Sequence, residues 1–212
     1  GAPVRVFNGR DGEWDVRIGN VQGKRASLEP VSRIRPQPDV PASAPVLLFA
    51  PVKKAETDFI VEKATELGAA QICPVLTERT QTRTVRLDRF HKIVLEAAEQ
   101  TERLDLPEVK DLQPLAAALD ALAAGTVVIF CDERGDDADA PWGGETGRAG
   151  PIADVLAGLG EAPVAILIGP EGGFTPEERD WLRGREDAAA VSLGPRILRA
   201  ETAAVAALSV WQ

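Results

Sequence analysis

The chain has 212 residues, with 24 basic and 33 acidic side chains and a net charge of −9. Hydrophobic residues make up 44% and charged residues 27% of it, a globular balance that excludes wholesale disorder. No apolar stretch reaches membrane-spanning length, and two cysteines with one histidine cannot build a zinc site, so we expect a reduced cytoplasmic protein with no membrane segment and no metal.

Residues 1–40 have the pattern of short β-strands joined by tight turns. Apolar and polar residues alternate over 4–7, 14–18 and 25–28, and Asn-Gly, Asp-Gly and Gly-Asn pairs separate these segments. Such pairs accept the positive φ that hairpin turns require. Prolines crowd the stretch that follows and prevent a strand or a helix from continuing. We expect a small β domain over 1–40 and a semi-rigid linker over 41–45.

Residues 46–212 alternate short apolar runs with amphipathic stretches. The pattern predicts strands at 46–50, 71–76, 126–131, 164–168 and 189–193. It predicts helices that end at Leu67, run from an Asp88 cap to Leu104, and cover 115–124, 151–159, 175–185 and 201–211. The Gly- and Asp-rich residues 134–150 are expected to form a surface loop. Strands alternating with helices indicate a mostly parallel sheet with helices on both faces.

The stretch 166–178 runs from a buried strand through a glycine-rich turn, Gly-Pro-Glu-Gly-Gly-Phe, into a helix. Thr175 with Glu178 predicts a capping box. Glycines at the carboxyl end of a parallel strand let the backbone approach a ligand. The turn matches neither the Walker P-loop nor the dinucleotide-binding pattern. A tight turn whose glycines serve geometry alone fits equally well, and spacing does not separate the two interpretations.

A second strand, turn and helix occupy 192–203. Ile197 and Leu198 form an apolar pair flanked by Arg196 and Arg199 in what should be an exposed loop. Such a pair suits the wall of a pocket for a ring such as adenine, and it could instead anchor the loop on the core. Because this turn and the first one follow neighbouring strands, we favour the pocket.

The two turns together, GPEGGFTPEE and LGPRILRAETAA, resemble the ribosomal RNA small subunit methyltransferase E family. The stretches FIVEKATELG, TERT and EAAEQTER are similar to earlier segments of the same family. The match runs from about Phe49 to the C-terminus. The β segment 1–40 is similar to the family's PUA-like barrel and is shorter than a complete one.

The resemblance implies an α/β fold of the SPOUT class, with a trefoil-knotted parallel sheet over 46–212 and helices on both faces. It implies a homodimer that binds S-adenosylmethionine in the knot loops and acts in rRNA processing and ribosome biogenesis. The expected activity is methyl transfer to N3 of a uridine in 16S ribosomal RNA, as free RNA or in the small ribosomal subunit. The resemblance implies that the residues of this chain that match the family's loop motifs bind the cofactor. They are Ile168, Gly169, Gly172, Gly173, Leu193, Gly194, Ile197 and Leu198. The end of the preceding strand, 131–133, is a weaker candidate.

Methyl transfer from a sulfonium is an in-line displacement, so the protein mainly has to orient donor and acceptor. Uracil N3 must lose a proton, and an arginine beside the uracil carbonyls would favour the anion. Arg199 is the first candidate for this catalytic role, with Arg196 second. Glu171 or Glu201 could accept the proton. An ion pair between Arg199 and Glu201 that merely fixes the loop is the alternative.

Basic residues between 79 and 92 give this segment a local net charge of +4. Such a run is often only a solvated face. Because it adjoins Gln100 and Arg103 on the expected helix, we favour a track for RNA phosphates. The expected RNA-binding residues are Arg79, Arg83, Arg86, Gln100 and Arg103.

Two other functions fit the same sequence: another knotted RNA methyltransferase that modifies a ribose 2′-hydroxyl or a different base, and a non-catalytic RNA-binding ribosome-assembly factor. The net negative charge of the whole chain argues against an RNA partner, but it does not show how the charges are distributed. Residues 1–45 carry a net charge of +2, whereas residues 111–168 carry −8. The acidic total therefore marks the side of the molecule where RNA should not lie.

Overall fold

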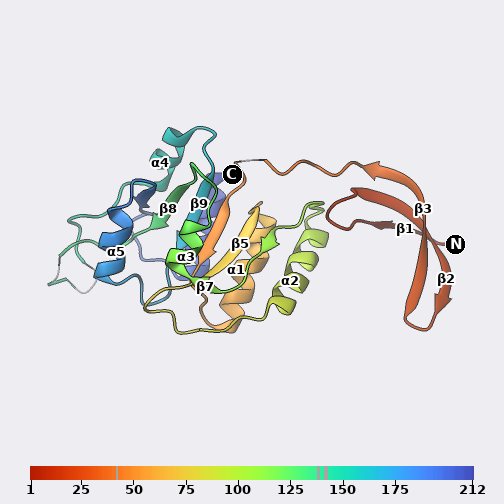
Figure 1. The fold of residues 1–212 in the computed structure, drawn as a ribbon, viewed down its shortest axis with the longest axis horizontal. Coiled ribbons are helices and arrows are strands. Elements are labelled where there is room, and N and C mark those ends of the chain that lie inside the picture. Colours follow the sequence, from red (N-terminus) through yellow and green to blue (C-terminus); the bar gives the residue numbers. More distant parts are fainter. Residues whose placement is uncertain (42, 138, 141–142) are drawn as a thin grey trace.

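A computed structural model describes residues 1–41, 43–137, 139–140 and 143–212. The chain forms two parts, a small antiparallel sheet at one end and a larger α/β body (Figure 1). Of the expected linker over 41–45, Ala42 lies outside the described residues, as do three residues of the expected surface loop over 134–150.

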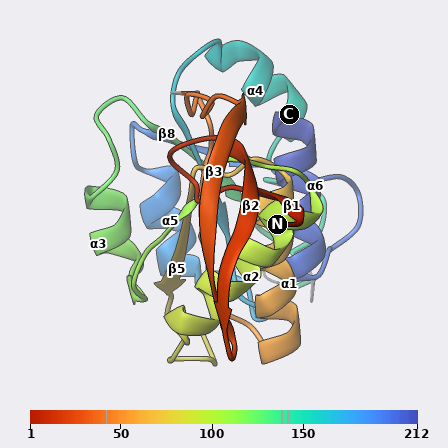
Figure 2. The ribbon, with the colours of Figure 1, turned by 90° about the vertical axis from the view of Figure 1, so that its right-hand side faces the viewer.

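The N-terminal sheet has three strands, β1 (Pro3–Val6), β2 (Glu13–Gln22) and β3 (Arg25–Arg35), in the order β1-β2-β3. Figure 2, viewed from that end of the molecule, shows the β2–β3 hairpin in front of the α/β body. Val16 is buried, whereas β3 is exposed along most of its length. The described strands do not close into a barrel, so the structure supports an antiparallel β module and not the complete PUA-like barrel.

The described residues of the body form one parallel sheet in the order β10-β8-β9-β4-β5-β6, with β7 also paired to β5. The bounds are β4 (Val46–Phe49), β5 (Gln71–Leu76), β6 (Glu108–Val109), β7 (Gln113–Pro114), β8 (Val127–Cys131), β9 (Val164–Ile168) and β10 (Ala188–Val191). All of these pairings are parallel, as expected, and β9 is buried throughout because strands and helices cover it on every side.

Helices cover both faces of the sheet and bury two apolar clusters. One cluster joins the sheet to α1 (Lys54–Glu66), α2 (Leu87–Gln100), α4 (Ile152–Leu159) and α6 (Ala200–Trp211). The other joins it to α3 (Leu115–Asp120) and α5 (Pro176–Arg183). The mixed α/β architecture is therefore confirmed. No helix in the described part of the chain is long and apolar enough to cross a membrane.

Helix ends differ most from the sequence expectation at α2 and α3. Helix α3 ends at Asp120 and not at 124. Helix α2 begins after Arg86, and Asp88 lies in its first turn, where it pairs with Arg86 and does not cap the helix. The same helix ends at Gln100 because Glu102 adopts a positive φ of 54°, which breaks the helical path before Leu104. Gln100 and Arg103 consequently do not share a helix face. Strands β6 and β7 have two residues each, too few for an alternating pattern to reveal.

Candidate functional site

The glycine-rich turn after β9 is built by local interactions. The Gly173 N–H donates to Pro170 O at 2.8 Å, and Gly173 has a positive φ of 63°, which a side chain would strain. The predicted capping box is confirmed: Thr175 Oγ1 accepts the Glu178 N–H at 3.1 Å, and Glu178 Oε2 accepts the Thr175 N–H at 2.9 Å. The turn is thereby fixed at both ends, with Gly169, Gly172 and Gly173 at its surface.

The second turn leads from β10 to α6. Gly194 has a φ of 120°, and its N–H donates to Ser192 Oγ at 3.2 Å. Ile197 is 64% exposed. Leu198 is half-buried against the core, and its N–H donates to Glu133 Oε2 at 3.0 Å. This hydrogen bond ties the second turn to the loop that follows β8.

The loop after β8 is clamped by a buried carboxylate. Asp132 is 3% exposed and accepts hydrogen bonds from Arg179 at 2.9 Å and Arg183 at 3.1 Å, both on α5. The two guanidinium groups also reach Asp136, at the surface of the same loop. The first turn of the site is followed by α5, so this clamp holds the β8 loop and the β9 turn in one arrangement.

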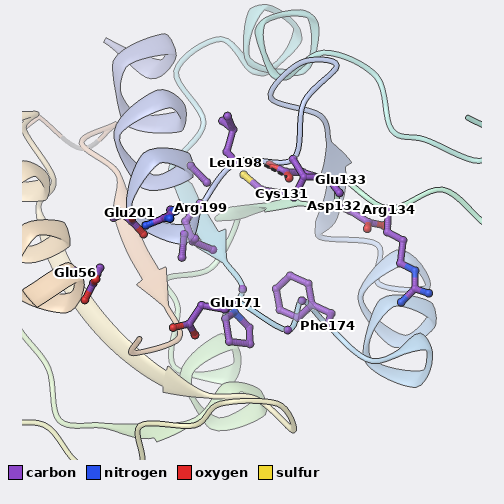
Figure 3. Close-up of a pocket in the computed structure, with 18 of the residues that line it drawn as sticks. Glu56, Cys131, Asp132, Glu133, Arg134, Glu171, Phe174, Leu198, Arg199 and Glu201 are labelled. Carbon is purple, nitrogen blue, oxygen red and sulfur yellow. Dashed lines mark hydrogen bonds between the residues drawn. The ribbon is translucent and has the colours of Figure 1, made fainter. Parts of the chain in front are cut away.

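The three loops after β8, β9 and β10, together with the start of α1 after β4, surround one cavity of about 640 Å³. That volume suits a ligand of nucleoside size. Figure 3 shows Arg199 and Glu201 at the start of α6, with Glu171 and Phe174 on the turn after β9. The described lining residues are Lys53, Glu56, Cys131, Asp132, Glu133, Arg134, Ile168, Gly169, Pro170, Glu171, Gly172, Gly173, Phe174, Arg179, Ile197, Leu198, Arg199, Ala200, Glu201 and Ala203.

Most of the residues expected from the sequence meet at this cavity. Six of the eight expected cofactor-binding residues line it, and Leu193 and Gly194 do not. Leu193 packs instead against the apolar core. All three expected catalytic residues, Arg199, Glu201 and Glu171, line the cavity, whereas Arg196 does not.

The lining also contains residues that sequence reasoning missed. Lys53 and Glu56 come from the start of α1, after β4, and Phe174 packs edge-on against Phe130 with ring centroids 6.1 Å apart. Cys131 belongs to the weaker candidate segment 131–133; its thiol also faces the cavity, and burial raises its pKa so that it stays protonated. The one available sequence signal for Lys53 was its position four residues after the end of the apolar strand β4.

Arg199 and Glu201 have separate positions at the entrance of α6. Arg199 is the N-cap residue, and its carbonyl accepts the Ala203 N–H at 2.8 Å. Among the described residues no ion pair joins the two side chains. The alternative of a loop-fixing Arg199–Glu201 pair therefore has no support in the structure, and the Arg199 guanidinium is exposed on the cavity side.

Glu133 is a half-buried carboxyl in the wall of the cavity. Burial raises the pKa of Glu133 above its ordinary value of 4.5, although the Leu198 N–H and Arg148 act in the opposite direction. The folded chain thus holds this proton more tightly than the unfolded chain. Ionisation of Glu133 therefore destabilises the fold, by an amount that is absent below the ordinary pKa and complete above the raised one.

Replacing Glu133 by glutamine should remove this penalty, since an amide oxygen can still accept the Leu198 N–H. At neutral pH we expect E133Q to unfold at a higher urea concentration than the wild type. The difference should vanish on acidification to about pH 4, where the carboxyl is protonated in both states. Urea unfolding across this range measures it, and a more stable wild type at neutral pH would contradict the assignment.

The five expected RNA-binding residues have different surroundings. Arg83 and Gln100 are exposed, and Arg86 pairs with Asp88 at the surface. Arg103 is only 11% exposed; it pairs with Asp105 and donates to Thr65 O and Ala69 O, which gives it an internal structural role. Arg79 bonds to two carbonyls of the turn after β9. Arg83 and Arg86 remain the basic groups of this set that face solvent.

The site lies in a region that matches known proteins. The model of the RNA methyltransferase domain matches residues 41–212. The chain is 30% identical over 208 residues to the ribosomal RNA small subunit methyltransferase E of Rickettsia conorii, covering 97% of this chain and 78% of that protein. The protein of the same name from Synechocystis is 32% identical over 210 residues, covering 96% of this chain but only 63% of that one.

A solved structure shares the fold. It is the ribosomal RNA small subunit methyltransferase E of Neisseria gonorrhoeae bound to S-adenosyl methionine. The two chains superpose with a TM-score of 0.75 at 27% identity, over 98% of this chain and 81% of that one.

Proposed function

The chain belongs to the ribosomal RNA small subunit methyltransferase E family, and from that premise we propose that it transfers a methyl group from S-adenosylmethionine to N3 of a uridine in 16S ribosomal RNA. The observation that carries the proposal is the convergence of the turns after β8, β9 and β10 on one cavity that also holds Arg199. The crowding of these three turns supports a trefoil knot of the SPOUT type.

The lining of the cavity fits S-adenosylmethionine. Ile168, Phe174 and Leu198 offer apolar surface for a purine, and the glycine turn leaves backbone groups accessible. A side chain at Gly173 would enter open space and not protein, so this face of the turn is free for a ligand. The carboxylates of Glu133 and Glu171 complement the positive charge of a sulfonium.

When bound, the cofactor supplies an electrophilic methyl group on a positively charged sulfur. The remaining chemistry falls to the chain's own residues. The exposed guanidinium of Arg199 can donate to the uracil carbonyls and stabilise the negative charge that develops when N3 loses its proton. Glu171 on the turn after β9 and Glu201 in the first turn of α6 line the same cavity, and either can accept that proton.

Substrate recognition requires surfaces outside the cavity. We assign phosphate contacts to the basic segment 79–92, with Arg83, Arg86 and Lys92 as its exposed basic members, and RNA binding also to the β module over 1–40. The proposal includes a homodimer, and the exposure of Ile197 supports it: this side chain is 64% exposed beside the cavity and is the kind of apolar group that a second copy would cover.

The proposed chemistry is tested by mapping the product. Small ribosomal subunits or 16S RNA that lack the modification are incubated with the protein and labelled S-adenosylmethionine, and the RNA is digested to nucleosides for mass analysis. We expect 3-methyluridine. A methylated ribose or another methylated base would identify a different knotted methyltransferase, and unlabelled RNA with retained RNA binding would favour the non-catalytic assembly factor.

Replacing both Arg83 and Arg86 by alanine should weaken RNA binding by roughly three- to tenfold and reduce the slope of log affinity against log salt by about 1–2. The reason is that two exposed guanidinium groups no longer release counterions from the phosphates. Lys110→Ala removes a cation that pairs with Glu108 outside the segment and serves as the control. An unchanged salt slope in the double variant would remove the segment from the RNA interface.

A further inference from the structure

The turn that follows β5, residues 77–80, packs directly against the glycine turn after β9. Arg79 Nη1 donates to Gly172 O at 2.8 Å and to Phe174 O at 3.2 Å, across more than ninety residues of chain. Both acceptor residues line the cavity, whereas Arg79 does not. We propose that Arg79 is a positioning residue that holds the glycine turn in its ligand-binding shape, an inference that rests on the proposed function.

The contact is made by the whole side chain of Arg79. A Cβ placed on Gly172 would meet Arg79 Cβ and Cδ at 3.5 Å, so the aliphatic stem already packs on this glycine. The guanidinium then satisfies two carbonyls that the turn leaves without partners in regular structure. A glycine-rich turn has little side-chain packing of its own, so an external donor that spans two of its carbonyls restricts it strongly.

Neighbouring residues make the 77–80 turn rigid enough for this task. Thr77 and Thr80 are buried, and Thr80 Oγ1 accepts the Thr77 N–H at 2.9 Å. The Glu78 N–H donates to Glu178 Oε1 at 2.8 Å, and the other oxygen of that carboxylate closes the capping box with Thr175. The turn therefore holds the glycine turn through Arg79 and the start of α5 through Glu178.

The next contact links the same segment to another wall of the cavity. Thr82 Oγ1 donates to Val52 O at 2.7 Å, directly before the lining residue Lys53. The segment 77–82 thus spans two loops of the site from behind. Charge alone suggested a phosphate contact for Arg79, but its guanidinium is engaged by protein carbonyls, whereas Arg83 forms no hydrogen bond or ion pair within the described residues.

The test compares Arg79→Ala with Arg83→Ala, the same substitution four residues along the segment. S-adenosylhomocysteine binding is measured by calorimetry, and RNA binding by titration. We expect R79A to weaken S-adenosylhomocysteine binding roughly tenfold to a hundredfold, since two hydrogen bonds to a charged donor are lost. R83A should leave this affinity unchanged and weaken RNA binding instead. Arg79→Lys, which keeps the charge and most of the stem, should recover part of the lost affinity.

Hydrogen exchange distinguishes a local loosening of the glycine turn from a loss of stability of the whole chain. In R79A the amides of 172–175 should exchange faster while those of β9 keep their protection. Equal S-adenosylhomocysteine affinity and equal exchange in R79A and the wild type would overturn the inference. If R79A does not fold, the same measurements are made on R79K. Wild-type affinity together with wild-type exchange in R79K would then overturn the inference. A wild-type chain that binds no S-adenosylhomocysteine refutes the proposed function, and the exchange comparison still decides the role of Arg79.

Discussion

Arg199→Ala is expected to lower kcat about 100- to 1000-fold, the usual effect of removing one donor that stabilises developing charge. The affinity for S-adenosylhomocysteine should change by less than about threefold, because Arg199 lies at the start of α6 and the turns that we propose to bind the cofactor stay intact. Single-turnover methylation and calorimetry give the two quantities separately. Equal losses in both would make Arg199 a structural residue of the turn.

Arg196 provides a matched control in the same turn. It is exposed, three residues away, and absent from the cavity lining. Arg196→Ala changes the local charge by the same amount as R199A, so a loss of turnover that arises from charge alone should be equal in the two variants. We expect a much smaller loss in R196A, because stabilisation of the uracil anion depends on a donor placed at the reacting base.

The largest effect on stability is expected for Asp132→Asn. The Asp132 side chain is 2% exposed and faces Arg179 and Arg183, which are 11% and 27% exposed. Removing the carboxylate charge leaves the two guanidinium groups without their buried partner, and breaking such an interaction costs about 3–5 kcal/mol. The free energy of unfolding from urea titration measures this loss. Affinity for S-adenosylhomocysteine should fall as well, since Arg179 also lines the cavity.

Asp136→Asn separates burial from charge in this cluster. Asp136 pairs with the same two arginines, but its side chain is 46% exposed. Solvent screens such pairs, so D136N should lower the free energy of unfolding by less than about 1 kcal/mol. Similar losses in D132N and D136N would show that the clamp depends on net charge and not on the buried geometry.

The parts of the fold that depend on neighbouring residues were predictable from the sequence. The bounds of β5 and β9 agree with prediction because continuous apolar runs flanked by turn residues define them. The capping box formed by Thr175 and Glu178 was also predicted, since its partners are three residues apart.

The interactions that could not be predicted join residues far apart in the chain. Asp132 and Arg179 are 47 residues apart, and Arg79 and Gly172 are 93 apart. No periodicity or local motif encodes such pairs, because they exist only after the parallel sheet brings the strand ends together. The sequence therefore indicated which turns line the cavity, but it assigned Arg79 and Arg103 to RNA where the structure engages both with internal carbonyls.

For the N-terminal β module, the sequence predicted the strands but not how they assemble. Short alternating segments predicted strands, and the structure confirms three of them, with β2 and β3 longer than expected because the hairpin pairs almost to its tip. Closure into a barrel is a property of pairing between distant strands, and the alternating pattern of single strands contains no information on it. The barrel was expected from the resemblance alone.

Calorimetric titration of the wild-type chain with S-adenosylhomocysteine tests the central claim most directly, because the claim is that three turns at the carboxyl ends of β8, β9 and β10 bind the methyl donor. We predict saturable binding at one site per chain, weakened in the variants of Asp132 and Arg79 and retained in R199A. An absence of binding heat from a folded wild-type protein would contradict a methyltransferase function for this cavity.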